Sequence, residues 1–266
     1  MPAAKKNFSG LRVAAFESRR ADDMARMIER FEGQPLVSPS MREVALPHNR
    51  EVVEFAHRLM AGQIDVVVFL TGVGARMLLE QVERHVNRDT FLGAVSDIKS
   101  VVRGPKPLAV LNEWKVTPTL RVPEPNTWRD LLATLDAHLP VANLTVGLQE
   151  YGIPNPSLIA GLEARGATVD AVKVYQWALP EDTEPLAENV RRIVASEVDV
   201  LMFTSANQIR NLLAVAERLG VEMELRAAMR KLVVASVGPT TTEMLAQFEL
   251  PVDLEPRHPK MGHLVQ

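Results

Sequence analysis

Two stretches of the chain place a hydroxyl side chain directly after a short apolar run. Thr71 follows DVVVFL and Ser205 follows DVLMFT, and each begins a segment with helical periodicity. A hydroxyl at this position is typical of a helix N-cap. The free backbone N–H groups at a helix N-terminus, together with the positive end of its dipole, can bind an anion. The pattern therefore indicates either plain helix caps or two parts of an anion-binding site.

The two glycines of Gly72-Val73-Gly74 suggest an alternative, namely the turn of a dinucleotide-binding site. The fingerprint of that turn needs a third glycine, at a position that Met77 occupies, and the matching Ser205-Ala206-Asn207 has no glycine at all. We therefore interpret both stretches as helix starts and not as a dinucleotide site.

A second pair of turns carries Gly-Pro at the start of a helical segment. In VGPTTTEML (237–245), Gly238-Pro239 precedes three threonines whose hydroxyls lie beside free amides. In RGPKPLAVL (103–111), Gly104-Pro105 is kept, but lysine and proline replace threonines. Four such helix starts facing one cleft would hold a ligand with several anionic groups. Arg19 could add a charge-assisted contact to carboxylates.

Tyr175 lies in the extended stretch VKVYQW and is one of two tyrosines, the other being Tyr151. A phenol could deliver a proton to a leaving hydroxyl, although a reference pKa of about 10 makes it a weak acid. The alternative is a structural strand residue.

An internal repeat indicates the elements that position these residues. Asp65–Leu79 laid over Asp199–Leu213 gives six identities in fifteen positions, where unrelated sequence gives about one. The same offset matches the two Gly-Pro turns. An offset shorter by one residue matches LTVGLQE (144–150) with LRVAAFE (11–17). The chain is a duplication.

The order of the repeated pieces predicts the fold. Apolar runs alternate with amphipathic helical patterns, which indicates an α/β fold with parallel sheets. We predict one α/β domain from residues 1–34 and 181–266, and a second, similar domain from 47–167. The β-rich segments 35–46 and 168–180 are predicted to form a two-stranded ladder between them, so that the first domain is discontinuous. Because ligands of such sheets bind at the carboxyl ends of the strands, we expect the four turns to line a cleft between the domains.

Composition restricts the class of protein. The 266 residues carry a formal net charge of −3 and no cysteine, which excludes disulfides and argues against a nucleic-acid partner. No apolar segment is long enough for a signal peptide or a membrane span. The six histidines lack the spacing of a metal site. We expect a cytoplasmic monomer without metal.

Four stretches together resemble the uroporphyrinogen-III synthase family over nearly the whole chain: DVLMFTSAN (199–207), ASVGPTTTEML (235–245), LPVDLEPRHPKMGHLV (250–265) and VKVYQW (172–177). The resemblance implies a cofactor-free lyase. Such an enzyme folds hydroxymethylbilane, a linear tetrapyrrole polycarboxylate, removes water from it and closes it to uroporphyrinogen III with the terminal ring inverted. It also implies that Tyr175 is the candidate acid. The candidate substrate-binding residues are Arg19, Thr71, Gly72, Gly104, Tyr151, Gly152, Ser205, Ala206, Asn207, Gly238, Pro239, Thr240 and Thr241.

Two departures from the family pattern keep alternatives open. Lys106 and Pro107 leave the 104–107 turn without a hydroxyl, and Glu17 places a negative charge close to the expected anion site. The first alternative is a synthase-like domain that has lost catalysis and senses a ligand, as part of a longer protein with a DNA-binding segment. The second is a hinged sugar- or amino-acid-binding domain of the periplasmic-binding type.

Overall fold

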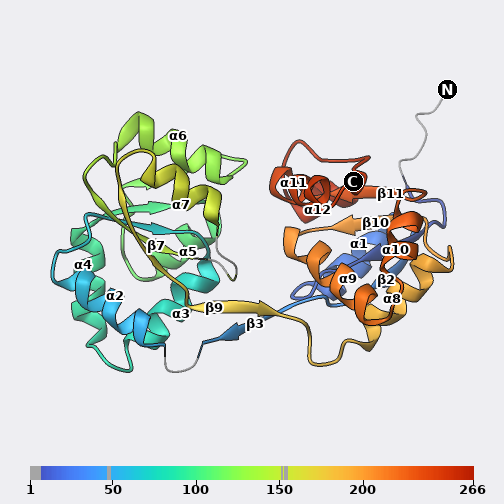
Figure 1. Cartoon of the computed structure of the whole chain (residues 1–266), viewed down its shortest axis with the longest axis horizontal. Helices are drawn as coiled ribbons and strands as arrows, with labels where there is room; N and C mark the ends of the chain where they lie inside the picture. Colours follow the sequence, from blue (N-terminus) through green and yellow to red (C-terminus); the bar gives the residue numbers. More distant parts are fainter. Residues whose placement is uncertain (1–6, 47–48, 151, 153–154) are drawn as a thin grey trace. The chain divides into compact units, whose positions relative to one another are not determined.

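The computed structural model describes residues 7–46, 49–150, 152 and 155–266. The chain divides into unit 1, Met1–Arg42 with Ala178–Gln266, and unit 2, Glu43–Trp177. Each unit holds one parallel sheet flanked by helices (Figure 1), so the predicted α/β class with parallel sheets is confirmed. None of the helices in the described part of the chain combines the length and apolar character that a bilayer crossing requires.

Unit 2 is built on a five-stranded sheet of order β6-β5-β4-β7-β8, in which each strand runs parallel to its neighbours. The strands are β4 (Val66–Phe69), β5 (Lys99–Val102), β6 (Leu120–Arg121), β7 (Thr145–Gln149) and β8 (Thr168–Val172). The helices are α2 (Arg50–Met60), α3 (Gly72–Val82), α4 (Arg88–Asp97), α5 (Pro105–Glu113), α6 (Trp128–His138) and α7 (Pro156–Glu163). Strand β4 is buried on both faces, since Val67 and Phe69 enter one apolar cluster and Val66 and Val68 enter the other. This central position explains why its sequence is continuously apolar.

Unit 1 is built on a four-stranded parallel sheet of order β11-β10-β1-β2. Its strands are β1 (Arg12–Ala15), β2 (Gln34–Val37), β10 (Val200–Phe203) and β11 (Val233–Ser236). Its helices are α1 (Ala21–Arg30), α8 (Glu184–Val194), α9 (Ala206–Arg218), α10 (Glu222–Met229), α11 (Pro239–Gln247) and α12 (Met261–Val265). Strands β1 and β10 lie side by side although they are far apart in the sequence, with Val13 opposite Val200.

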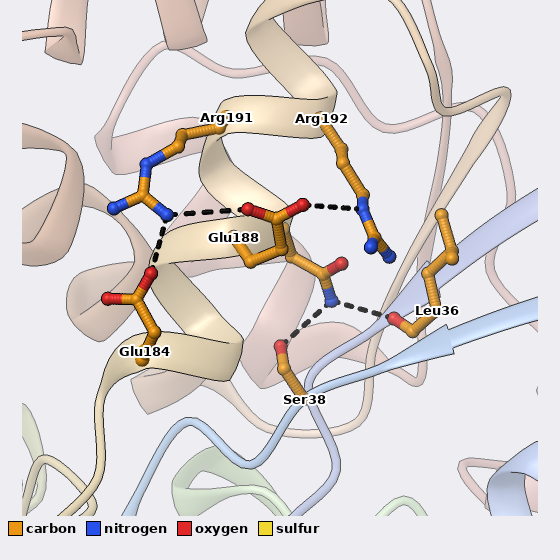
Figure 2. A network of polar contacts seen from close by, with 7 residues as sticks. Leu36, Ser38, Glu184, Glu188, Arg191 and Arg192 are labelled. Carbon is orange, nitrogen blue, oxygen red and sulfur yellow. Dashed lines mark hydrogen bonds and ion pairs between the residues drawn. The ribbon is translucent and has the colours of Figure 1, made fainter.

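A buried amide ties the two sequence segments of unit 1 together. The Asn189 side chain on α8 is 3% exposed, and its Nδ2 donates to the Leu36 carbonyl at 2.8 Å and to Ser38 Oγ at 2.9 Å (Figure 2). On the same helix, Glu188 pairs with two arginines, Arg191 and Arg192 (Figure 2). Because burial strengthens a hydrogen bond and penalises its loss, Asn189 anchors α8 to β2 and to Ser38 just after it.

The predicted ladder segments are shorter than expected. In 35–46 and 168–180, the first part of each segment belongs to a domain sheet: β2 pairs with β1, and β8 pairs with β7. Only β3 (Arg42–Ala45) and β9 (Tyr175–Ala178) form the separate two-stranded sheet. The sequence could not separate these strands, because one long β-rich run and two short strands share the same composition. The break before β3 is fixed by buried Ser40, whose Oγ donates to the Phe16 carbonyl at 2.8 Å.

The amino ends of both sheets carry equivalent aspartates. Asp65 accepts a hydrogen bond from the Thr145 backbone N–H at 2.7 Å, and Asp199 accepts one from that of Arg12 at 2.8 Å. Asp199 also receives the Arg12 guanidinium, with Nε and Nη2 at 3.0 and 2.9 Å. The hydrogen bonds from the Arg12 side chain and then its backbone lower the pKa of Asp199 to about 2.

Asp199→Asn is expected to lower the free energy of unfolding of unit 1 at pH 7 by about 1 kcal/mol, because the pair is partly exposed and screened. Since the native pKa of Asp199 is depressed, its contribution is present above the unfolded-state pKa of about 4 and is lost as the pH falls through about 2. Urea unfolding followed by circular dichroism at pH 7, 4 and 2 measures the difference, which should shrink towards pH 2. Asp65→Asn is the control, and an equal effect of both variants would show that the Arg12 guanidinium contributes nothing.

Candidate functional site

Two helix starts lie at the carboxyl edge of the unit 2 sheet, as the sequence predicts. Thr71 is the N-cap of α3, and its Oγ1 accepts a hydrogen bond from the Gly74 backbone N–H at 3.0 Å. Gly104 is the N-cap of α5, and Pro105 is the first residue of that helix. Both helices follow a strand directly, so their N-termini face the edge at which ligands of parallel sheets bind.

Gly72 brings these two helix starts together. A Cβ on Gly72 would lie 2.8 Å from the Lys106 backbone oxygen, closer than side-chain carbons approach backbone. Only glycine therefore allows the first turns of α3 and α5 to touch. Lys106 and Pro105 are exposed at the start of α5, so this edge carries a lysine charge where a threonine hydroxyl was expected from the family.

Tyr175 lies against the cap of α3. Its side chain is 1% exposed, and its hydroxyl is 3.4 Å from Thr71 Oγ1. Its ring packs edge-to-face on Trp177, with a centroid separation of 5.6 Å. Gly152 has a φ of +53° and touches the same indole so closely that a Cβ would overlap it. Besides Gly72 and Gly104, unit 2 thus holds the predicted site residues Thr71, Gly152 and Tyr175, whereas Tyr151 lies outside the described residues.

A buried glutamine supports the Thr71 turn, and sequence reasoning did not identify it. Gln149 at the end of β7 is fully buried, and its Oε1 accepts a hydrogen bond from the Thr71 backbone N–H at 3.3 Å. Its Nε2 donates to the Glu150 carbonyl. A Cβ on Gly74 would overlap the Gln149 amide. The available signal was a polar residue at the end of the apolar strand LTVGLQ, yet no motif contains it.

Glu150 is a second buried polar group at this edge. Its side chain is 7% exposed, and burial raises the pKa of its carboxyl, while Lys173 and a backbone hydrogen bond to Asn155 lower that pKa. Asn155 is the N-cap of α7, so the carboxyl also approaches that helix start. Among the described residues, no group of three or more His, Cys, Asp or Glu side chains could hold a metal ion.

Unit 1 carries the equivalent helix starts at its own carboxyl edge. Ser205 is the N-cap of α9, and Gly238 is the N-cap of α11 with Pro239 as the first helical residue. Gln208 Oε1 accepts hydrogen bonds from the Thr204 and Ser205 backbone N–H groups at 2.7 and 3.3 Å. All four predicted helix starts are therefore confirmed as helix starts, while their role in binding stays a prediction.

The remaining predicted residues of unit 1 differ in accessibility. The side chains of Arg19 and Thr240 are exposed, and Ala206 is partly buried. Asn207 is 7% exposed and Thr241 is 3% exposed. The Asn207 amide points to the Met41 sulfur, at 3.9 Å. Arg19 and Thr240 thus present side chains to solvent, whereas Asn207 and Thr241 are packed inside.

The carboxylate of Glu17 is engaged within unit 1. Its Oε1 accepts a hydrogen bond from the Arg20 backbone N–H at 3.3 Å, and its Oε2 accepts one from Thr204 Oγ1 at 2.5 Å. Arg20 is the N-cap residue of α1, so the negative charge of Glu17 is stabilised by the start of that helix.

Comparisons with known proteins agree over most of the chain. The family model of uroporphyrinogen-III synthase HemD matches residues 22–266. The uncharacterized protein YjjA of Bacillus subtilis (strain 168) is 31% identical over 261 residues, which cover 98% of this chain and 95% of that protein. A mutant uroporphyrinogen III synthase from the extremely thermophilic bacterium Thermus thermophilus superposes with a TM-score of 0.73 at 24% identity, covering 97% of this chain and 96% of that one. The wild-type protein in a second crystal form gives 0.56 at 26%, with the same coverage. The chain therefore belongs to the uroporphyrinogen-III synthase (HemD) family.

Proposed function

We propose that this protein is a cofactor-independent lyase that closes hydroxymethylbilane to uroporphyrinogen III. Membership of the family supports the reaction class. The observation that carries the proposal is the pair of helix starts at the carboxyl edge of each unit, capped by Thr71, Gly104, Ser205 and Gly238. A tetrapyrrole polycarboxylate needs several anion-binding positions, and helix N-termini supply them without many lysines or arginines.

In the proposed reaction, the terminal hydroxyl of the substrate leaves as water with a proton from Tyr175. The resulting azafulvenium cation is attacked by the far pyrrole ring at its own substituted carbon. The spiro intermediate opens and recloses with that ring inverted. Since the substrate also cyclises spontaneously without inversion, holding its ends in the productive arrangement is the main task, and positioning should supply most of the rate.

Each predicted binding residue takes a role that fits its accessibility. We assign backbone N–H contacts to Gly72, Gly104 and buried Asn207. Pro239 has no N–H, and the N–H of Thr241 already donates to the Gly238 carbonyl at 3.0 Å, so these two residues shape the start of α11. Arg19 and Thr240, both exposed, would contact substrate carboxylates through their side chains. Location in the cytoplasm and a monomeric state remain expectations from the sequence.

A coupled assay that supplies freshly made hydroxymethylbilane, with the oxidised porphyrins separated by isomer, tests the proposal. Type III porphyrin formed faster than the spontaneous background is the expected result. Formation of type I alone would favour a synthase-like domain that binds a tetrapyrrole without transforming it. The turn at Lys106 supports this non-catalytic alternative, because it lacks the hydroxyl of the family pattern.

Thr240→Val is expected to raise KM about fivefold with kcat unchanged, because the exposed hydroxyl would contribute one hydrogen bond to a bound carboxylate. Steady-state kinetics of type III formation measure both constants. Thr90→Val is the matched control, since Thr90 is also an exposed threonine in a first helical turn, but its helix α4 follows a helix and not a strand. If the two variants have the same KM, the α11 start does not bind substrate through Thr240.

A further inference from the structure

The two units support their substrate turns with amides from different elements. In unit 1 the amide is that of Gln208 on α9, which accepts hydrogen bonds from the turn at Ser205. In unit 2 it is that of Gln149 on β7, which accepts one from Thr71. In the internal repeat, Gln208 aligns with Gly74. The same function is therefore performed from the helix in one unit and from the strand in the other.

The residue at the equivalent strand position also differs between the units, and it differs in the complementary way. In the repeat, Gln149 aligns with Phe16, and both lie beside the phenylalanine that ends the neighbouring strand. In unit 1, Phe16 stacks on Phe203 with a centroid distance of 5.0 Å, and the amide comes from the helix. In unit 2, Gln149 is the strand residue, and position 74 must be glycine to make room for its amide. Both units thus keep a side-chain amide at this turn although the residue that carries it has moved, which indicates that the amide itself matters.

Only unit 2 extends this arrangement to a phenol. Thr71, held at its backbone by Gln149, approaches the hydroxyl of Tyr175 at 3.4 Å. In the repeat, Tyr175 aligns with Arg42. Arg42 pairs instead with Glu181 at 3.0 Å, within unit 1. The Ser205 turn therefore has the amide without the tyrosine.

We propose that Gln149 is a positioning residue for Tyr175, acting through Thr71, and that unit 2 supplies the proton while the Ser205 turn of unit 1 only binds. This inference rests on the proposed function. The Thr71 oxygen already accepts a hydrogen bond from the Gly74 N–H. The Thr71 hydroxyl can therefore donate its own proton to the phenolic oxygen, and this contact fixes the position of the Tyr175 hydroxyl.

The first test compares matched variants of the two amides. Gln149→Met keeps length and volume but removes the acceptor, and is expected to lower kcat about tenfold with KM within twofold, because a misplaced acid slows only the chemical step. Gln208→Met removes the equivalent amide where there is no phenol, and is expected to raise KM with kcat within twofold. If both variants change the same constant, the division of roles between the units is wrong.

The second test is a double-mutant cycle with Tyr175→Phe. If Gln149 acts through the phenol, Gln149→Met combined with Tyr175→Phe should be no slower than Tyr175→Phe alone. If the rate losses of the two single variants multiply in the double variant, the proposal is overturned, because Gln149 would then have an effect independent of Tyr175. Tryptophan fluorescence of each variant in urea shows whether unit 2 remains folded.

Hydrogen exchange separates this inference from the proposed function. Gln149→Met should speed exchange of the Thr71 amide about fivefold, because that amide loses its hydrogen bond to the glutamine. Gln208→Met should do the same for the Thr204 and Ser205 amides of unit 1 and leave the Thr71 amide unchanged. A wild-type protein that makes only type I porphyrin would refute the proposed function and the acid role together. Unchanged Thr71 exchange in an active Gln149→Met variant would refute the positioning role alone.

Discussion

Gly74→Ala is expected to lower the free energy of unfolding of unit 2 by about 2 to 3 kcal/mol. The added Cβ would overlap the amide of Gln149, which is fully buried and cannot move aside without losing its hydrogen bond to Thr71. Urea unfolding followed by tryptophan fluorescence reports this change directly. All three tryptophans of the chain, Trp114, Trp128 and Trp177, lie in unit 2.

Two further variants make this test specific. Gly93→Ala alters another helical glycine of unit 2, on α4, where nothing lies within 4 Å of the new Cβ, so it should stabilise by about 0.5 to 1 kcal/mol. Gly74→Gln combined with Gln149→Phe reproduces the arrangement of unit 1, and should recover much of the stability that Gly74→Ala loses. Equal effects of Gly74→Ala and Gly93→Ala would contradict the proposed overlap.

Tyr175→Phe is expected to lower kcat about 100-fold, at the low end of what a general acid supplies, because a phenol is a weak acid. The ring and its edge-to-face packing on Trp177 are kept, and only the hydroxyl near Thr71 is lost. KM should stay within twofold. Steady-state formation of type III porphyrin measures both constants.

The control for Tyr175→Phe is Thr71→Ser, which keeps the hydroxyl that caps α3 and faces the phenol, and should retain most of kcat. Turnover of Tyr175→Phe within twofold of the wild type would remove the acid role from Tyr175. Glu150 would then be the next residue to replace, because burial raises the pKa of its carboxyl at the same sheet edge.

Local signals predicted the helix starts, because N-caps and Gly-Pro turns act within a few residues. The repeat predicted two sheets of the same class, since matched apolar runs fold alike. The ends of the ladder strands were wrong, because strand pairing depends on which neighbour each run meets. Gln149 was missed for a related reason: its partner Gly74 is distant in the sequence, and only the fold shows that the amide fills the glycine's free space. The burial of Asn207 likewise follows from tertiary packing.

The discontinuity of unit 1 sets the order in which the protein can be completed during synthesis. Strands β1 and β2 are synthesised before unit 2, yet β10, which pairs with β1, and β11, which pairs with β10, follow only after all of unit 2. At about 5 to 20 residues per second, the roughly 180 residues between β1 and β10 take about 10 to 40 s to translate. During that interval the unit 2 sheet can close from contiguous sequence, while β1 presents an unpaired edge. Unit 2 can thus fold before unit 1, and one edge of β1 stays unpaired until β10 has been made.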